Sequence, residues 1–249
     1  METRWQHAIV VGASGGIGEQ IARKLCASGT KVALVGRRED KLRRVAADIN
    51  GVSLSLATVH VHDVADFGSA EQVFEDAVRA LGGLDIIVYA AGAMPLIGPT
   101  EYDIEKDAPT VTTNLIGAMA WLNLAAKRFE RGRGGTIVGI GSVSGDRGRR
   151  GNPAYGASKA GLECYLESLR NRLATLGVNV CTVKPGPVKT PMTEQRGRLP
   201  GMIGAERAAD LILRAAAKNN KTAYIPMRWW FVSKVFRMIP SFFFRRLNL

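Results

Sequence analysis

Seven short apolar runs are spread along the chain, and most of them carry Val and Ile at successive positions. A strand that is buried on both faces has this continuous pattern, whereas a half-exposed strand alternates apolar and polar residues. The pattern therefore predicts parallel strands that are covered on both sides. These strands are expected at residues 7–11, 31–35, 58–62, 84–90, 136–140, 179–183 and 223–225.

Between the strands, apolar residues recur at the three- and four-residue spacing of a helix. Strands that alternate with such helices form right-handed βαβ units, which predicts an α/β fold with one doubly wound parallel sheet. No linker divides the chain, so we expect one domain over residues 1–226 and an appended tail over residues 227–249. The helices are marked by Ile17, Ile21 and Leu25, by Val111, Leu115, Met119 and Leu122, and by residues 155–176, which Gly177 ends.

The composition is that of a globular protein. Of 249 residues, 46% are hydrophobic and 22% are charged, which argues against disorder. The three cysteines are an odd number without metal-like spacing, so we expect no disulfide scaffold, no metal site and a reducing, cytoplasmic location. The first predicted strand begins too early to leave room for a signal peptide, and no apolar stretch reaches the ~18 residues of a membrane span.

Basic residues outnumber acidic ones by 34 to 22, which gives a formal net charge of +12. The excess is concentrated, because residues 211–249 contain eight Lys or Arg and no Asp or Glu. A second basic cluster consists of Arg147, Arg149 and Arg150. Such a charge suits nucleic acid, an anionic membrane or acidic ligands. No nucleic-acid-binding module accompanies either cluster, so we expect no nucleic-acid partner.

The first predicted strand runs into a glycine-rich turn, Gly-Ala-Ser-Gly-Gly-Ile-Gly, and a helix follows. Such a turn brings backbone N–H groups and the positive end of the helix to a pyrophosphate. Its G-x-x-x-G-x-G spacing is one residue longer than the G-x-G-x-x-G dinucleotide fingerprint. A flexible turn is the alternative, but the flanking strand and helix favour a cofactor loop. The candidate contacts are Gly12, Ser14, Gly16, Ile17 and Gly18.

The end of the second strand bears on the choice of cofactor. Proteins that bind NAD place an acid there for the ribose 2′-hydroxyl, whereas NADP binders place Arg for the 2′-phosphate. This chain lacks the acid and has Arg37 and Arg38, which predicts NADP(H) unless the pair is only a solvated turn. Asp63 and Val64 close the third strand, where a carboxylate can accept a hydrogen bond from an adenine amino group or simply belong to a turn.

Tyr155 and Lys159 lie at i and i+4 and therefore share one face of a predicted helix. A phenol ionises near ~10, and a neighbouring ammonium favours the phenolate, which brings the proton into a useful range. Ser142 closes the fifth strand at the carboxyl edge of the sheet, where α/β folds bind ligands. Because chance pairs with this spacing are common, the pair by itself is weak evidence.

Several motifs occur together in order and in register. They are Gly12-x-x-x-Gly16-Ile17-Gly18, Asn114, Ser142, Tyr155-Gly-Ala-Ser-Lys159 and Pro185-Gly-Pro-Val-Lys-Thr190. In these motifs the chain resembles the short-chain dehydrogenase/reductase family over residues 5–226. The resemblance implies a nicotinamide-dependent oxidoreductase with a seven-stranded, Rossmann-like sheet in the order 3-2-1-4-5-6-7.

The resemblance also implies roles for individual residues. Tyr155 would be the general acid of reduction or the base of oxidation, and Lys159 would bind the nicotinamide ribose and lower the Tyr155 pKa. Ser142 would hold the substrate oxygen, and Asn114 would fix a water of the proton relay. Thr190 and the Val188 backbone would hold the carboxamide, and the other implied cofactor contacts are Ala91, Gly92 and Pro185.

Two positions depart from the family pattern. Val11 stands where the family has Thr, and Tyr89-Ala90-Ala91-Gly92 stands where it has Asn-Asn-Ala-Gly. The family's side chains brace one another by hydrogen bonds, and here both ends of the brace are replaced together, so no buried polar group loses its partner. We expect altered local rigidity without loss of activity.

The substrate side of the site is predicted from the segments that follow strands four, five and six. These segments are apolar, which favours a lipophilic carbonyl or alcohol, although the same residues could simply pack a lid. Arg147, Arg149, Arg150, Arg196 and Arg198 are expected to form a solvated rim rather than an anion site. The apolar set consists of Met94, Pro95, Leu96, Ile97, Val143, Met192, Leu199, Met202 and Ile203.

The tail is basic and aromatic. Drawn as a helix over residues 228–239, it has a narrow polar sector of Ser233, Lys234 and Arg237 beside Trp230 and is otherwise apolar. Aromatic and basic residues without acids suit the surface of an anionic membrane. We therefore predict an enzyme that is peripheral to a membrane, with packing on the domain or on a sister subunit as the alternative.

Together these residues predict an NADP(H)-dependent carbonyl reductase, or the reverse alcohol dehydrogenase, with a small lipophilic substrate. A 3-oxoacyl carrier-protein reductase is an alternative, because basic patches can dock an acidic carrier. A non-catalytic dinucleotide sensor or membrane scaffold is another, and the intact catalytic set argues against it. The family resemblance, with Trp121 and Leu166 as apolar positions that lack a partner within the chain, predicts a homodimer or homotetramer through residues 111–128 and 155–176.

Overall fold

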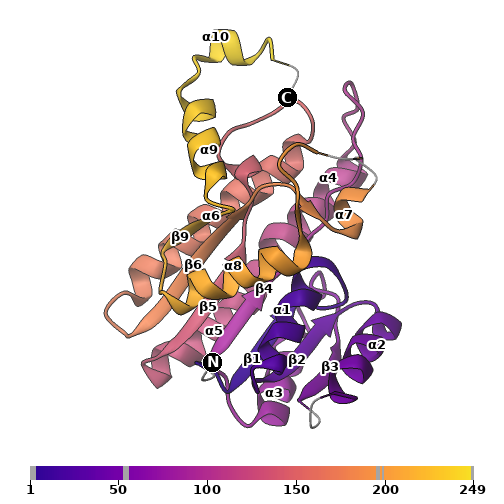
Figure 1. The fold of residues 1–249 in the computed structure, drawn as a ribbon, viewed down its shortest axis with the longest axis vertical. Coiled ribbons are helices and arrows are strands. Elements are labelled where there is room, and N and C mark those ends of the chain that lie inside the picture. The colour runs from indigo at the N-terminus through magenta and orange to yellow at the C-terminus, as the bar shows by residue number, and fades with distance from the viewer. Residues whose placement is uncertain (1–3, 53–55, 195–196, 198, 248–249) are drawn as a thin grey trace.

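The structure, a computed structural model, describes residues 4–52, 56–194, 197 and 199–247. Its centre is a parallel sheet in the order β3-β2-β1-β4-β5-β6-β9, which is the predicted order with the seventh strand numbered β9 (Figure 1). Each predicted strand is confirmed to within two residues at either end. The strands are β1 (His7–Val11), β2 (Lys31–Gly36), β3 (Ala57–Val61), β4 (Ile86–Tyr89), β5 (Gly135–Ile140), β6 (Val178–Pro185) and β9 (Thr222–Ile225).

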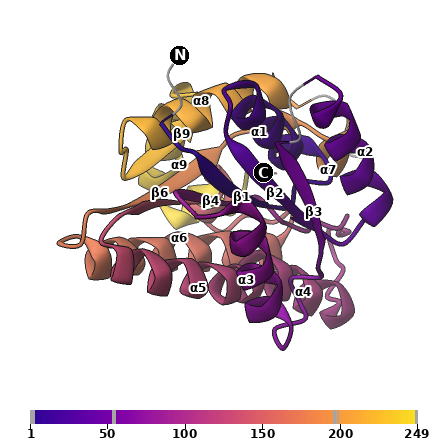
Figure 2. The ribbon, with the colours of Figure 1, turned by 90° about the horizontal axis from the view of Figure 1, so that it is seen from below.

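Helices cover both faces of this sheet (Figure 2). They are α1 (Gly16–Ala27), α2 (Glu39–Asn50), α3 (Ala70–Leu81), α5 (Gly117–Gly132), α6 (Pro153–Leu173) and α8 (Ala205–Ala217). On one face α1, α2 and α8 bury residues such as Ile21 and Ile212, and on the other α3, α5 and α6 bury residues such as Phe74. Successive strand residues join opposite cores, as Ile9 and Val10 do, which is why the strands are apolar throughout.

The predicted long helix before β5 is divided into three parts. Helix α4 (Ile104–Val111) leads into a π-helical segment, η1 (Thr112–Ile116), and α5 follows. A π turn holds more residues than an α turn and so changes the phase between the two helices. Of the two predicted positions in α5, Leu122 is buried and Met119 is only partly buried. The buried residues of α5 are Gly117, Ala118, Trp121, Leu122, Ala125, Ala126 and Phe129.

The expectation that Trp121 and Leu166 lack a partner within the chain is wrong. Both side chains are fully buried in the core on the α5–α6 face of the sheet. The Trp121 indole meets the Phe74 ring edge-on, with 6.1 Å between the ring centroids, and donates a hydrogen bond to Nδ1 of His62 at 3.3 Å. These two residues therefore give no support to an oligomer.

Parallel strands bring all their carboxyl ends to one edge of the sheet, so the segments after β1, β4, β5 and β6 meet there. Two short strands, β7 (Val188–Lys189) and β8 (Ile203–Gly204), pair in parallel outside the main sheet. They were not predicted, because two-residue strands carry no periodicity. The pair ties the segment after β6 to the start of α8.

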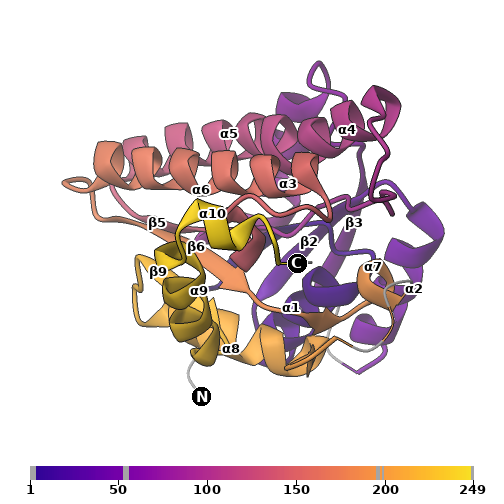
Figure 3. The same ribbon diagram turned by 90° about the horizontal axis from the view of Figure 1, so that it is seen from above.

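The tail forms α9 (Arg228–Met238) and α10 (Ser241–Phe244), which stand at one end of the molecule (Figure 1). Seen from above, α9 runs alongside β9 (Figure 3). In the part of the chain that the structure describes, no helix has the length and apolar character that crossing a membrane requires.

Candidate active site

Glycines in the turn after β1 stand where neighbouring backbone comes too close for a side chain. Gly12 has a φ of +91°, and a Cβ there would lie 2.4 Å from the backbone nitrogen of Ala91. A Cβ on Gly18 would lie 2.3 Å from the carbonyl oxygen of Gly12, so α1 packs directly under the turn. Gly16 has a φ of +59° and faces Thr190. Gly12 and Gly16 line a cleft at the N-terminus of α1, where their backbone is not covered by side chains of their own, and this fits a dinucleotide pyrophosphate.

The two arginines after β2 have different partners. Arg38 is extended over the glycine turn, where its Nη2 and Nε donate to Ser14 Oγ at 2.8 and 3.2 Å. The Arg37 side chain is 69% exposed, and its Nη1 lies 3.5 Å from Oδ2 of Asp63. Two cations and one carboxylate leave this group positively charged overall, which suits a phosphate better than a neutral hydroxyl.

A cleft of about 1060 Å³ runs along the carboxyl edge of the sheet and brings most of the predicted residues together. Three predicted residues do not line the cleft. Gly18 packs beneath the glycine turn, and Asp63 pairs with Arg37. Asn114 is buried behind the loop after β4, where it binds Ala93. The predicted residues that line the cleft are Gly12, Ser14, Gly16, Ile17, Arg37, Arg38, Val64, Ala91, Gly92, Ser142, Tyr155, Lys159, Pro185, Val188 and Thr190.

Ser142 and Tyr155 are among the hydroxyl-bearing residues that line this cleft. Ser142 follows β5, and its Oγ accepts a hydrogen bond from the Ser144 nitrogen at 3.1 Å, which holds the side chain at the start of a short 3-10 turn. Tyr155 lies in the first turn of α6, where the Asn152 side chain caps the helix by accepting from the Tyr155 nitrogen at 3.0 Å. Both hydroxyls are therefore carried by backbone that is fixed locally.

Lys159 lies one turn further along α6 and is 5% exposed. Its Nζ donates to the Ile140 carbonyl at 2.8 Å and lies 5.8 Å from the centroid of the Tyr155 ring. Burial lowers the pKa of Lys159 to about 8, and the carboxylate of Glu163 opposes this shift. The phenol therefore has beside it an ammonium whose proton is only weakly held.

Replacing Lys159 by Met is expected to reveal the cost of burying this charge. Between pH 8 and 10.5 the unfolded chain holds a proton that the native lysine has lost, so the stability of the wild type rises with pH relative to the variant. The difference in the free energy of unfolding between the two should change by roughly 2 to 3 kcal/mol from pH 7 to pH 10. Urea unfolding at both pH values measures it, and Lys218→Met, at an exposed position, is the control. A constant difference would contradict the prediction.

Asn114 is completely buried in the π-helical segment. Its Oδ1 accepts from the Ala93 nitrogen at 2.7 Å, and its Nδ2 donates to the Ala93 carbonyl and to Ser158 Oγ, both at 2.9 Å. The side chain therefore ties the loop after β4 to α6. Single π turns inside helices are frequent at functional sites, and the role of Asn114 in a water relay stays a prediction.

Tyr89 makes a brace of its own at the position where the chain departs from the family. It pairs with Val11 in the sheet, and its hydroxyl donates to the Thr113 carbonyl at 2.6 Å. Burial raises the pKa of Tyr89 well above its usual range, so the hydroxyl stays a donor. This hydrogen bond joins β4 to the π-helical segment that carries Asn114.

The apolar part of the cleft contains five of the predicted substrate-side residues: Met94, Pro95, Val143, Met192 and Leu199. Leu96, Ile97, Met202 and Ile203 do not line it, and Ile203 lies in β8. The cleft also contains residues that were not predicted, among them His62, Thr110, Thr113, Asn152 and Trp229.

Trp229 is the most distant of these in the sequence, because it comes from the first turn of α9. Its indole lies against Gly186, where an added Cβ would be 2.1 Å from Nε1. Only glycine at position 186 leaves room for the ring. That glycine is the one trace of this contact in the sequence, and it does not identify its partner.

The expectation of a solvated arginine rim is wrong for two residues. Arg147 donates to the carbonyls of Phe236 and Ile239 in the tail, and its guanidinium lies 3.9 Å from the Phe244 ring centroid. Arg149 lines the cleft, and burial lowers its pKa. Of the other three, Arg150 is exposed, and Arg196 and Arg198 lie outside the residues that the structure describes.

A comparison with known families and proteins agrees with this geometry. The family model described as short chain dehydrogenase matches residues 6–199. An uncharacterized oxidoreductase of Staphylococcus epidermidis is 35% identical over 187 residues, which are 75% of this chain and 80% of the relative. An uncharacterized oxidoreductase of Myxococcus xanthus is 29% identical over 245 residues, which are 96% of this chain and 95% of the relative.

Solved structures show the same fold. A crystal structure of actinorhodin polyketide ketoreductase with NADPH has a TM-score of 0.80 and 26% identity, and the match covers 90% of this chain and 97% of that one. The chain therefore belongs to the short-chain dehydrogenase/reductase family and is an oxidoreductase.

Proposed function

We propose that the protein transfers a hydride between NADP(H) and a carbonyl or alcohol group, with Asn114, Ser142, Tyr155 and Lys159 as the residues that serve the reaction. The observation that carries the proposal is the cleft itself. Ser142, Tyr155 and the buried Lys159 line it together, and the glycine turn forms another part of its wall. The cofactor, when bound, supplies the hydride, and the protein supplies orientation and electrostatics.

The hydroxyl groups account for the proton chemistry. Negative charge builds on the carbonyl oxygen during reduction, and Ser142 and Tyr155 are placed to donate hydrogen bonds to it. Tyr155 then delivers the proton, and the Lys159 ammonium stabilises the phenolate that remains. In the direction of oxidation the same phenolate removes the proton. Asn114 keeps the loop after β4 in place beside α6.

The glycine turn is proposed to hold the pyrophosphate, with the 2′-phosphate of NADP(H) at Arg37 and Arg38. The positive charge of this group supports the choice, as does the likeness to a ketoreductase whose structure contains NADPH. Asp63 and Val64 are proposed to contact the adenine, and the nicotinamide half would be held by Ala91, Gly92, Tyr155, Lys159, Pro185, Val188 and Thr190.

The proposed substrate is lipophilic, because Met94, Val143, Met192, Leu199 and Trp229 line the cleft. A screen of free lipophilic ketones with the purified full-length protein, followed by NADPH absorbance, tests the function. Turnover of free ketones supports the proposal, and a clear preference for acyl thioesters on a carrier protein favours a 3-oxoacyl carrier-protein reductase. NADPH binding without turnover of any ketone or thioester would favour a non-catalytic sensor or scaffold.

We also propose that residues 227–249 hold the enzyme peripherally on the cytoplasmic face of a membrane. The supporting observation is the orientation of α9: Ser233 faces inward and is buried, whereas apolar residues of the tail face outward. The basic side chains of the tail are exposed beside them, and each could contribute ~1 kcal/mol near an anionic surface. The exposed apolar residues are Met227, Phe231, Val235, Met238, Phe242, Phe243 and Leu247.

The triple variant Phe231→Ser, Met238→Ser and Phe243→Ser is expected to weaken binding to anionic liposomes at least about tenfold, because binding scales with the apolar area that is inserted. All three side chains are more than half exposed, so folding should survive. Co-sedimentation at low salt measures the effect, and the control replaces three exposed apolar residues elsewhere by Ser, namely Val52, Val61 and Phe67. Wild type that fails to co-sediment decides against the membrane proposal, and a triple variant that instead loses its oligomer decides for an intersubunit cover.

The division of the chain at residue 226 and a homodimeric or homotetrameric state are further proposals. Oligomers are common among enzymes of this family, which supports an oligomer here. The interface is proposed to lie on α5 and α6, although not through Trp121 or Leu166.

A further inference from the structure

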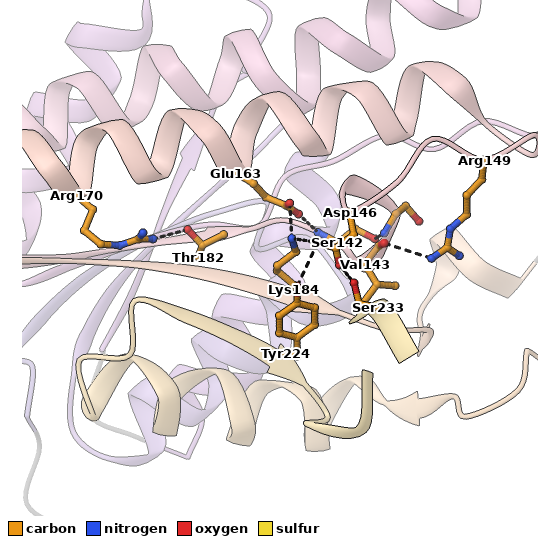
Figure 4. Close-up of polar contacts among 11 residues, drawn as sticks. Ser142, Val143, Asp146, Arg149, Glu163, Arg170, Thr182, Lys184, Tyr224 and Ser233 are labelled. Atoms are coloured by element: carbon orange, nitrogen blue, oxygen red, sulfur yellow. Dashed lines mark hydrogen bonds and ion pairs between the residues drawn. The ribbon is translucent and has the colours of Figure 1, made fainter. Parts of the chain in front are cut away.

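A cluster of buried charged and hydroxyl side chains lies behind Ser142 (Figure 4). Lys184 of β6 stands at its centre, where its Nζ pairs with Asp146 and lies 2.7 Å from Oε2 of Glu163. The side chains of Lys184, Asp146 and Glu163 are 9%, 3% and 12% exposed. Two carboxylates and one ammonium so far from water persist only where hydrogen bonds satisfy their remaining atoms.

Glu163 connects the cluster to the backbone of Ser142, at the end of β5. Its Oε1 accepts a hydrogen bond from the backbone nitrogen of Ser142 at 3.0 Å. Gly141 and Gly145 on either side make this approach possible, since a Cβ at these positions would lie 2.6 and 2.8 Å from the same oxygen. Glu163 therefore anchors the backbone of the residue whose hydroxyl faces the cleft.

The cluster reaches the tail through Asp146, which directly follows the 3-10 turn after Ser142. Asp146 accepts a hydrogen bond from the Ser233 hydroxyl of α9 and another from the Tyr224 hydroxyl of β9 at 3.2 Å. Ser233 is 3% exposed, although Phe231 and Val235 on the same helix are 60% and 58% exposed. The Ser233 hydroxyl is thus a point at which α9 docks on the domain.

The loop between Ser142 and Arg147 is consequently held from two sides. Helix α6 holds its first residue through Glu163, and the tail holds its end through Ser233 and through the carbonyls that Arg147 binds. Lys184 joins the two attachments because one ammonium contacts both carboxylates. A shift of α9 therefore acts on both carboxylates and, through them, on Ser142.

We propose that Asp146, Lys184 and Glu163 are positioning residues that couple the docking of α9 to the placement of the Ser142 hydroxyl. The inference deepens the proposed function and rests on it, in that Ser142 contacts the substrate oxygen. Misplacement of a catalytic group by about 1 Å can cost on the order of a hundredfold in rate. Because Trp229 of the same helix lines the cleft, docking of α9 also completes the substrate wall.

The variant Ser233→Ala tests the coupling in the full-length protein. It removes one hydroxyl and leaves every ion pair intact, whereas replacing Lys184 would leave two buried carboxylates without their cation. Hydrogen exchange of the amides of residues 142–146 is expected to become at least about tenfold faster, as the loss of a charge-assisted hydrogen bond predicts. Exchange in β1 and the affinity for NADPH should not change.

Matched variants separate a lost hydroxyl from a damaged helix. Ser233→Thr keeps the hydroxyl and should restore slow exchange, and Lys234→Ala changes an exposed neighbour and should have no effect. Tyr224→Phe, which removes the other hydroxyl donor to Asp146, is the second variant if Ser233→Ala does not fold. With a ketone from the screen, kcat should fall about tenfold in Ser233→Ala while KM for NADPH stays constant.

The proposal is overturned if hydrogen exchange at residues 142–146 is unchanged in Ser233→Ala. It is also overturned if Ser233→Thr accelerates this exchange as much as Ser233→Ala does. The exchange measurement needs no substrate, so it separates two kinds of failure. If exchange responds as expected and the wild type reduces no substrate, the coupling stands and the proposed function fails. If the wild type is an active reductase and exchange does not respond, only the coupling fails.

Discussion

Replacing Tyr155 by Phe is expected to remove nearly all turnover while NADPH binding survives. The substitution deletes one hydroxyl from a side chain that faces the cleft and leaves the ring in place. Without that hydroxyl the developing oxyanion loses a donor and the proton has no source, so the rate should fall by about 100- to 10,000-fold. Single-turnover measurement of NADPH oxidation, with NADPH affinity measured separately, checks both parts.

Tyr165→Phe is the matched control for this prediction. Tyr165 lies on the same helix, and its hydroxyl donates to Oδ1 of Asn123 at 2.9 Å, away from the cleft. The control should keep most of its activity. If Tyr155→Phe keeps most of its activity as well, the proposed proton donor is wrong.

Replacing Arg37 by Asp is expected to abolish or reverse the preference for NADP(H). A charge-assisted contact with a phosphate contributes about 1.5 to 3 kcal/mol, and the new carboxylate would stand beside Asp63 and repel the phosphate. The ratio of kcat/KM for NADPH to that for NADH should therefore fall at least about tenfold. Initial rates with both cofactors at one fixed substrate concentration measure this ratio.

Arg44→Asp provides the matched control, because it makes the same change of charge at an exposed position of α2. It should leave the ratio unchanged. A wild-type enzyme that uses NADH better than NADPH at equal concentration would show that the two arginines do not select the cofactor. Arg38→Ala is a less selective probe, because Arg38 also holds Ser14 in the glycine turn.

Much of the fold was predictable because a strand that is covered on both faces has apolar residues at successive positions, and this pattern is visible in the sequence. The continuous apolar runs located all seven strands of the main sheet, and helical spacing between them located α1, α6 and the helical segment before β5. The glycine turn and the Tyr155–Lys159 pair were predictable for the same local reason, since both depend on residues within one turn or one helix. Ser142 was predictable from its place at the end of a strand.

Periodicity alone could not determine how deeply a helix is covered. Trp121 lies on an apolar face, but whether a second helix or a sister subunit covers that face depends on contacts with distant residues. The π-helical segment at Asn114 was also beyond prediction, because one extra residue in a turn leaves no signal in the apolar pattern and still rotates the helix that follows. The hydroxyl of Tyr89 donates to the carbonyl of Thr113 within that segment.

The contacts of the tail with the domain are the part of the structure that the sequence predicted least. The sequence by itself determined that α9 has a polar sector within an apolar helix and that Gly186 follows β6. Only the tertiary structure decided that Ser233 meets Asp146, 87 residues away, that Arg147 binds the tail, and that Trp229 lies against Gly186 in the cleft. The physical reason is that a polar sector is satisfied equally well by water or by a buried carboxylate, and the choice depends on which partner the rest of the fold brings to it.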